Sequence, residues 1–279
     1  MAKRGAAKAK GTNGTHEPAA ETVQTLPLFY RGPRPVDASR HAKYGVVGQA
    51  DLSFARTTNV IPLNIGEMAT ASKCYPIVFA AEPPHMPVVI CGVQDGVNVF
   101  VTAGNRWAQN AYVPAYVRRY PFIFMESQDR EQLILSIDES SDLVSEGGDQ
   151  PLFDADGKQT EIVNRALEFC KAFHQQNRAT REFVAALAEH ELLTDNTTEI
   201  RLSENRRIEL TGYKIIDARK LDELDDKVFL EFRKHGWLPA IYHQQQSGSN
   251  WPNILWNAAA RNAEQAADAA GEKPEQKDS

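Results

Sequence analysis

The sequence has no long hydrophobic run. Its longest unbroken apolar stretches are residues 76–81 and 86–91, whereas a helix that spans a bilayer needs about 20 consecutive apolar residues. We therefore expect no transmembrane segment in this chain.

Cysteine is scarce as well. The chain contains three cysteines, Cys74, Cys91 and Cys170, an odd number that cannot pair completely within one chain. None of them has the CxxC or Cys/His spacing of a metal site, and each adjoins an apolar or aromatic residue. We expect buried free thiols, which are typical of a reducing compartment.

The chain also lacks an excess of basic residues. It has 31 Lys and Arg against 37 Asp and Glu, which gives a formal net charge of -6. A protein that follows a nucleic-acid backbone needs a basic surface, so the charge disfavours nucleic acid as a partner. Hydrophobic residues make up 42% and charged residues 24%, which are the proportions of an ordinary globular protein rather than a fibrous or wholly disordered one.

The common catalytic signatures are missing too. There is no GxGxxG, Walker A, GxSxG or HExxH motif, and the seven histidines include no pair spaced for a metal on one helix or strand. Residues 154–157 (Asp-Ala-Asp-Gly) begin like a calcium loop but lack the closing glutamate, so we expect an Asp-Gly turn there. The sequence predicts no cofactor and no metal.

Composition divides the chain into three regions. Residues 1–24 are rich in small and charged residues with no apolar segment behind the basic ones, which predicts a disordered N-terminal arm rather than a secretory signal. Residues 258–279 have no apolar stripe and predict a disordered C-terminal tail. We expect residues 25–257 to form the folded domain. Without a signal peptide we expect a cytoplasmic protein, with surface association only through signal-independent export.

The first half of the domain, up to about Asp149, has short apolar runs separated by Pro, Gly, Asn and Asp, a pattern typical of strands. These runs are residues 59–65, 75–80, 88–93, 97–102 and 131–137. Asp95-Gly96 tolerates the positive φ of a tight turn, so we expect a hairpin over residues 88–102.

After Pro151 the apolar spacing becomes that of helices. Thr160 is the expected N-cap of a first helix, and Thr180 is the expected start of a second one. Residues 199–202 and 207–216 alternate around a polar turn at residues 203–205, which predicts another hairpin.

Helix-end signals mark the last part of the domain. Asp217 and Asp225 are expected N-caps of two short helices, and Gly236 should end the second. A final helical segment should cover residues 238–257, with an interruption near residues 247–249. The fold class expected from both halves is α+β, with a β-rich N-terminal half packed against a helical C-terminal half that carries a second β-hairpin.

The densest group of functional side chains lies in residues 105–124. The candidate ligand-binding residues there are Trp107, Tyr112, Tyr116, Arg118 and Arg119. Two adjacent arginines among tyrosines can clamp an anion or a peptide carboxylate, because guanidinium groups pair bidentately with carboxylates and stack on aromatic rings.

A structural explanation of the same segment is favoured over a clamp. Tyr112, Tyr116 and Tyr120 are spaced by four and can share one helical face in the core, while the two arginines form internal ion pairs. Pro121 should end this helix and start an extended run over residues 122–125.

Asp138 and Glu139 are further candidates because they follow a predicted strand, where carboxylates can meet a cleft. An acidic residue at a strand end is more often a turn or cap residue, so general acid-base chemistry is the less favoured explanation.

Several of these motifs together resemble the bacterial SapC family. They are Tyr-Pro-Ile-Val-Phe at 75–79, Arg-Trp at 106–107, the eleven-residue string at 112–122, Ile-Asp-Glu at 137–139, Pro-Leu-Phe-Asp-x-Asp-Gly at 151–157 and the Gly-Trp-Leu…Ile-Tyr stretch at 236–242. The resemblance runs in order over most of residues 26–256. Residues 102–105 (Thr-Ala-Gly-Asn) depart from the acidic turn that relatives tend to have there.

The resemblance implies an accessory or binding role rather than a reaction. The family takes its name from a locus for a paracrystalline bacterial surface layer, and similar proteins are commonly encoded near TonB-dependent receptors and tryptophan-halogenase-like proteins. It implies an accessory protein of surface-layer or outer-membrane uptake systems, whose partner is an unknown protein or a small anionic ligand.

The alternative is an enzyme that acts on a small anionic or peptide substrate. It would use Arg118, Arg119, Asp138 and Glu139. A deep pocket in which these four side chains converge would favour the enzyme, whereas dispersed or mutually paired side chains would favour the accessory role.

Overall fold

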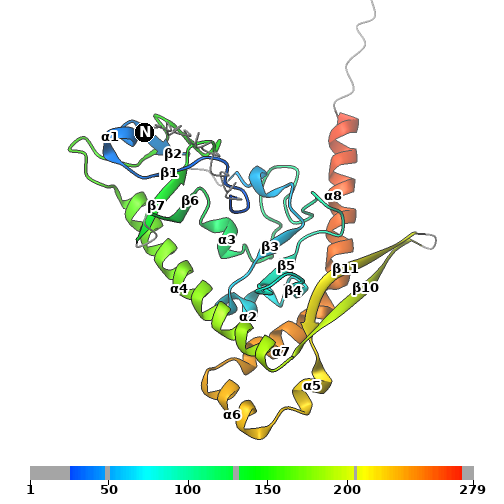
Figure 1. Cartoon of the computed structure of the whole chain (residues 1–279). Coiled ribbons are helices and arrows are strands. Elements are labelled where there is room, and N and C mark those ends of the chain that lie inside the picture. Colours follow the sequence, from blue (N-terminus) through cyan, green and yellow to red (C-terminus); the bar gives the residue numbers. More distant parts are fainter. Residues whose placement is uncertain (1–25, 48–50, 128–131, 204–205, 272–279) are drawn as a thin grey trace, which may run out of the picture.

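The computed structural model describes residues 26–47, 51–127, 132–203 and 206–271 (Figure 1). Strands dominate as far as Pro151, and long helices follow, with one long hairpin between them. The α+β class and its division into a β-rich half and a helical half are confirmed.

The largest sheet has five antiparallel strands in the order β10-β11-β4-β5-β3. Their bounds are β3 Val60–Pro62, β4 Ile77–Ala80, β5 Pro87–Ile90, β10 Leu193–Ser203 and β11 Arg206–Ile216. The predicted second hairpin is confirmed as β10 and β11, which also join this sheet through Tyr213 and Lys214, opposite Ala80 and Phe79 of β4. The far end of the hairpin projects from the body of the molecule (Figure 1).

Two smaller antiparallel sheets lie at the other end of the molecule. One has the order β1-β7-β6, with bounds Pro33–Pro35, Leu133–Asp138 and Phe122–Glu126. The other has the order β8-β2-β9, with bounds Val144–Glu146, Tyr44–Val46 and Gln150–Pro151. β6 begins directly after Pro121, so the predicted extended run over residues 122–125 is confirmed.

Short helices lie between the strands of the β-rich half, and longer helices form most of the C-terminal half. The first group is α1 Ala38–His41, η1 Ser53–Ala55, η2 Ile65–Glu67, α2 Met68–Ala71 and α3 Ala115–Arg118. The second is α4 Glu161–Glu189, α5 Ala218–Asp222, α6 Asp226–Lys234, α7 Leu238–Ser247, η3 Gly248–Asn250 and α8 Trp251–Gly271.

The long helix α4 connects two hydrophobic cores. Its C-terminal part buries Phe183 and Leu187 in the core of the five-stranded sheet, where Phe183 lies 6.5 Å from the ring of Phe79. Its N-terminal part buries Val163 and Cys170 in a second core below β6 and β7. Figure 1 shows α4 running between these two ends of the molecule. One helix thus holds the small sheets and the large sheet together.

The prediction that a second helix begins at Thr180 is wrong, because α4 continues through this residue. Thr180 is fully buried; its Oγ1 donates to the carbonyl of Gln176 at 2.6 Å and accepts the backbone N–H of Ile65 at 2.9 Å. Threonine favours N-cap positions, but it fits inside a helix here because its hydroxyl makes both of these hydrogen bonds. Thr160 does occupy the N-cap position of α4.

The predicted hairpin over residues 88–102 is also wrong. β5 ends at Ile90, and both of its edges are already paired, with β3 and with β4. Val99 donates to the carbonyl of Cys91 at 2.8 Å, and Val101 forms an isolated bridge with Trp107. With both edges of β5 occupied, residues 97–102 pass over the sheet as turns and bridges instead of adding a strand.

The expected helix ends are confirmed. The carboxylates of Asp217 and Asp225 accept backbone N–H groups in the first turns of α5 and α6. Gly236, with φ 71°, follows His235, the C-cap residue of α6, and glycine adopts this conformation without steric cost. The Asp154 turn is confirmed as well, since its carboxylate accepts the N–H groups of Asp156 and Lys158.

The two predicted tails are not tested. The N-terminal arm, residues 1–24, lies outside the described residues. α8 extends from Trp251 to Gly271, beyond residue 258, where the tail was expected to start. No helix in the described parts of the chain is long and apolar enough to cross a membrane.

Candidate anion-binding site

A pocket of about 230 Å³ lies between the segment after α3 and the first turns of α4. We call it the arginine pocket. Arg118, Arg119 and Arg165 line it together with apolar residues that include Phe122, Ile162 and Phe169. It therefore combines three cationic side chains with an apolar wall, and it contains both arginines of the predicted clamp.

Local sequence sets the positions of the two adjacent arginines. α3 is only four residues long and lies between two prolines. Pro114 precedes it directly, and Pro121 follows its last residue, Arg118, by three positions. Neighbours on a helical turn point about 100° apart, so Arg118 is exposed whereas Arg119 is half-buried. The two guanidinium groups consequently have different surroundings.

Arg118 is held at the surface by neutral groups. Its Nε donates to the carbonyl of Val113 at 3.1 Å, and its Nη2 donates to the hydroxyl of Tyr112 at 3.0 Å. Its guanidinium carbon lies 5.3 Å from the ring centroid of Phe169 on α4. These contacts fix the side chain but leave its positive charge without a carboxylate partner among the residues that the structure describes.

Arg119 lies among aromatic rings. Its guanidinium carbon is 4.2 Å from the ring centroid of Tyr116 and 4.3 Å from that of Phe173. Its Nε is buried and has no hydrogen-bond partner among the described residues. Burial raises the pKa of the nearby Tyr30 and Tyr116 hydroxyls, and the positive charge of Arg119 partly opposes both shifts. Cation-π attraction therefore replaces ion pairing at this position.

The predicted internal ion pairs of Arg118 and Arg119 are wrong within the described part of the chain. The ion pairs found there include neither residue. Arg165 does contact Glu161, at 3.6 Å, but both side chains are mostly exposed, and such surface pairs are weak. The arginine pocket is thus positively charged in a chain whose net charge is -6.

The three tyrosines do not share one helical face, because α3 starts at Ala115 and Tyr112 precedes it. Their hydroxyls bind in three different places. Tyr112 donates to Oε1 of Glu67 at 2.9 Å, Tyr116 to the carbonyl of Leu28 at 3.2 Å and Tyr120 to Asp138 at 3.3 Å. Each tyrosine therefore joins this segment to a different part of the β-rich half.

Asp138 lies outside the arginine pocket and is fully buried. Its carboxylate accepts the backbone N–H groups of Arg31, Gly32 and Ser140 at 2.9–3.1 Å, and the hydroxyl of Tyr120. The arrangement connects the end of β7 to the segment before β1, and four donors occupy the carboxylate.

Glu139 faces a different group. It forms an ion pair with Arg40, and its Oε1 lies within hydrogen-bond distance of Nε2 of His41, at 3.0 Å. The other ring nitrogen, Nδ1, lies 3.2 Å from the backbone of Asp37. Arg118, Arg119, Asp138 and Glu139 consequently do not converge in one pocket.

Trp107 is also separate from the arginine pocket. Its Nε1 donates to the hydroxyl of Tyr75 at 2.7 Å, and its ring stacks on Phe100. It supports the core of the five-stranded sheet rather than the pocket.

Sequence reasoning missed Arg165 and Phe169 as pocket residues, although a signal was present. Residues 162, 165, 166 and 169 follow the three-and-four spacing of one helical face, so Arg165 had to lie beside the apolar stripe. What the sequence could not show is that this stripe faces α3.

A larger pocket, of about 450 Å³, lies between β4, β11 and α7. No charged side chain lines it, and its main polar groups already bind within the fold. Gln244 donates to the carbonyl of Ile77 at 3.0 Å, and the hydroxyl of Tyr213 contacts Asn196 and Thr198. The arginine pocket is the better candidate for an anion because its charge is not compensated.

Nucleophilic and metal chemistry find little support in the described residues. Cys91 and Cys170 are buried free thiols and Cys74 is half-buried. Burial raises the pKa of Cys170 to about 11, so this thiol is protonated at neutral pH and a poor nucleophile. No group of three His, Cys, Asp or Glu residues suited to a metal occurs in the described part of the chain.

Comparison with known proteins identifies the family. The family model described as SapC matches residues 36–254, which is most of the chain and includes every candidate residue named above. The chain belongs to the SapC family. No curated protein and no solved structure matches it. The SapC region ends within α8, after Ile254, and contains the whole arginine pocket and every strand except β1.

Proposed function

We propose that this SapC-family protein is a non-enzymatic accessory or binding protein of bacterial surface-layer or outer-membrane uptake systems, and that the arginine pocket holds the anionic end of its ligand. The observation that carries the proposal is the uncompensated charge of Arg118 and Arg119 beside the apolar wall of Phe122, Ile162 and Phe169. A carboxylate attached to an apolar group matches both features, because guanidinium groups bind carboxylates bidentately.

The positions of the acids support binding rather than catalysis. Asp138 already accepts four hydrogen bonds, and Glu139 is paired with Arg40 and His41. A general acid or base must reach the reacting group, and neither carboxylate lines the arginine pocket. The alternative, an enzyme that acts on a small anionic or peptide substrate, would need its acid-base group elsewhere.

A cytoplasmic location is part of the proposal. Its basis is the set of three free cysteines, two of them buried, since unpaired thiols are typical of a reducing compartment. A cytoplasmic SapC protein would serve an uptake system from the inner side, as a carrier or assembly factor. Cell fractionation tests this part: recovery from the periplasm would contradict it.

Binding of N-acetylphenylalanine, compared with its amide, tests the site. Calorimetry should detect the carboxylate but not the amide, and added salt should weaken binding. Arg118→Ala should reduce affinity by about tenfold to a hundredfold, as expected for loss of a charge-assisted hydrogen bond. Arg118 is exposed, so this variant should still fold.

Arg165→Ala and Arg178→Ala form a matched pair on α4. Each arginine contacts a glutamate one helical turn away, at 3.6 and 3.4 Å, and each is exposed, but only Arg165 lines the arginine pocket. Arg165→Ala should weaken binding and Arg178→Ala should not. Equal binding of acid and amide, or equal effects of the two substitutions, would contradict the proposal. Conversion of either compound to a product would favour the enzyme.

A further inference from the structure

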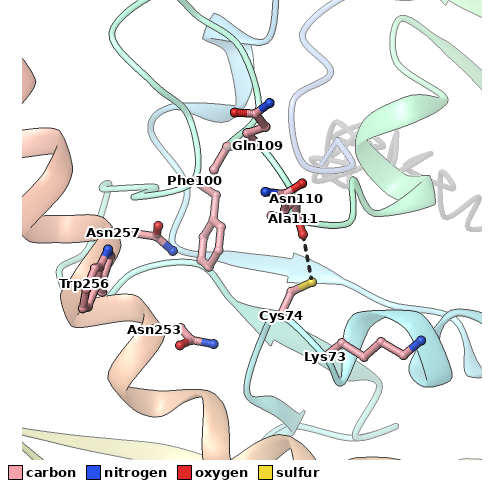
Figure 2. A pocket seen from close by; sticks show the side chains of 10 residues that line it. Lys73, Cys74, Phe100, Gln109, Asn110, Ala111, Asn253, Trp256 and Asn257 are labelled. Carbon is pink, nitrogen blue, oxygen red and sulfur yellow. Dashed lines mark hydrogen bonds between the residues drawn. The ribbon is translucent and has the colours of Figure 1, made fainter.

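A third pocket, of about 170 Å³, lies where α8 passes the end of α2 and the turn at residues 108–111. We call it the Trp256 pocket. Figure 2 shows Asn253 and Asn257 extending from α8 toward Phe100 and Cys74, with Trp256 beside Asn257. It lies outside the arginine pocket and shares no lining residue with it.

Trp256 is unusually exposed for an indole. It has 79% of its surface accessible, more than any other large hydrophobic residue described as exposed. Around the axis of α8, Trp256 lies about 60° from Asn253 and about 100° from Asn257, so Asn253 lies between the other two side chains. The opposite face of α8 packs into the core through Ile254, which is fully buried, and Ala258. Packing of α8 therefore does not require the indole at position 256.

The facing wall is built from a turn. Asn110 has φ 67°, and its carbonyl accepts the thiol of Cys74 at 3.8 Å. Ala111 closes the turn through a hydrogen bond to the carbonyl of Ala108 at 3.2 Å. The turn holds Gln109 and Asn110 at the edge of the pocket, across from α8.

The polar groups of the Trp256 pocket are mainly carboxamides. Gln109, Asn110, Asn253 and Asn257 supply four of them. Only Asn253 uses its side chain within the described structure, donating from Nδ2 to Asn250 at 2.9 Å. Each carboxamide offers both donors and an acceptor. The pocket thus presents neutral groups of both hydrogen-bonding kinds beside an aromatic face.

Charge contributes little to this site. No carboxylate lines it, and the single cation, Lys73, points away from α8 in Figure 2. An anion would lack a counter-charge, and an apolar ligand would provide no hydrogen-bond partner for the carboxamides of Gln109, Asn110 and Asn257. A ligand that carries many hydroxyls around a ring with one apolar C–H face satisfies both the indole and the carboxamides.

We propose that the Trp256 pocket is a carbohydrate-binding subsite that takes one pyranose ring of a neutral sugar. The indole of Trp256 stacks on the C–H face of the ring. The carboxamides of Asn253, Asn257 and Gln109 exchange hydrogen bonds with its hydroxyls, and Phe100, Ala108 and Ala111 form the apolar floor.

Titration of the full chain with glucose, galactose, mannose, N-acetylglucosamine and their oligomers tests this inference. Tryptophan fluorescence and ligand-observed magnetic resonance should show saturable binding of at least one of these sugars, with a Kd of about millimolar for a single ring, as expected for one small contact area. Absence of saturable binding by every probe would overturn the inference.

Substitutions at position 256 locate the binding. Trp256→Ala should weaken binding of the responding sugar by about tenfold or more, as is typical of truncating an aromatic anchor, and Trp256→Phe should retain most of it. Tyr242→Ala removes another exposed aromatic residue, on α7 and 45% accessible, and should have no effect. Equal binding by Trp256→Ala and the parent would overturn the assignment.

Arg118→Ala separates this inference from the proposed function. The arginine pocket and the Trp256 pocket share no lining residue, so Arg118→Ala should leave sugar binding unchanged. Loss of carboxylate binding alone or sugar binding alone then identifies which site fails. Competition between N-acetylphenylalanine and the sugar would contradict the separation of the two sites.

Discussion

Arg118 and Glu67 are joined through one hydroxyl. The Nη2 of Arg118 donates to the hydroxyl of Tyr112 at 3.0 Å, and that hydroxyl donates to Oε1 of Glu67 at 2.9 Å. The same Oε1 accepts the backbone N–H of Ala115 at 2.6 Å, at the start of α3. A cation of the arginine pocket is therefore connected to the buried carboxylate that anchors α3 to η2.

This connection predicts alkaline sensitivity. Burial, followed by the charge of Glu67, raises the pKa of Tyr112 to about 12 from the ordinary value of 10.0. The folded protein thus keeps a proton that the unfolded chain releases. The stabilisation is complete below pH 10 and is lost as the pH rises from 10 toward 12. Urea unfolding across this range should show the free energy of unfolding falling.

Tyr112→Phe should reduce the slope of that fall, because it removes one of the hydroxyls responsible. Tyr30, Tyr75, Tyr116 and Tyr120 also have raised pKa values, with burial as the main cause, so part of the slope should remain. Tyr242→Phe, at an exposed position, is the control. An unchanged slope in Tyr112→Phe would show that its hydroxyl ionises normally in the folded protein.

Arg119 should contribute to stability through packing rather than through its charge. Its guanidinium lies between Tyr116 and Phe173, with no carboxylate partner in the described structure. Arg119→Met keeps most of the volume and removes the desolvated charge, so the free energy of unfolding should change by less than about 1 kcal/mol. Arg119→Ala leaves a gap and should lower it by about 2 kcal/mol.

Thermal unfolding of the two Arg119 variants decides between these effects. If Arg119→Met destabilises the protein as much as Arg119→Ala does, the charge itself stabilises the fold, and a partner outside the described residues must be sought.

Local features of the fold were predictable from the sequence and distant pairings were not. Asp217, Asp225 and Gly236 were identified correctly because caps act within one helical turn. The hairpin over residues 88–102 was wrong because its formation depended on a free edge of β5. That edge is taken by β3, a pairing that no local pattern around Asp95-Gly96 records.

In the candidate site, too, the local motif was predictable from the sequence and the distant partners were not. Arg118 and Arg119 were visible as a dense motif, but their partners come from α4, about 50 residues later in the chain. Asp138 and Glu139 were grouped with them because they adjoin a strand end. Their partners, among them Arg31 and Arg40, precede them by about 100 residues. Residue type indicated the chemistry, whereas tertiary packing decided which groups meet.

Asp138 should contribute strongly to the stability of the fold. Asp138→Ala leaves three backbone N–H groups and the hydroxyl of Tyr120 without their acceptor. An unsatisfied buried donor costs about 1–3 kcal/mol. We therefore expect the free energy of unfolding, measured with urea, to fall by about 3 kcal/mol. Asp142→Ala, four residues later and exposed, should have little effect. A stable Asp138→Ala variant would revive the acid-base role considered for this residue.

Thr180 lies inside α4 instead of beginning a helix, and it connects α4 to η2. Its hydroxyl donates to Gln176 within α4 and accepts the N–H of Ile65 at the start of η2. Thr180→Val preserves the shape of the side chain but leaves the Ile65 N–H unsatisfied, which should lower the free energy of unfolding by about 1–2 kcal/mol. Thr180→Ser loses a methyl group and keeps both hydrogen bonds.

Amide hydrogen exchange distinguishes the two variants. Exchange of the Ile65 amide should accelerate in Thr180→Val and stay near the parent rate in Thr180→Ser. Equal protection of Ile65 in both variants would mean that packing, and not this hydrogen bond, joins α4 to η2.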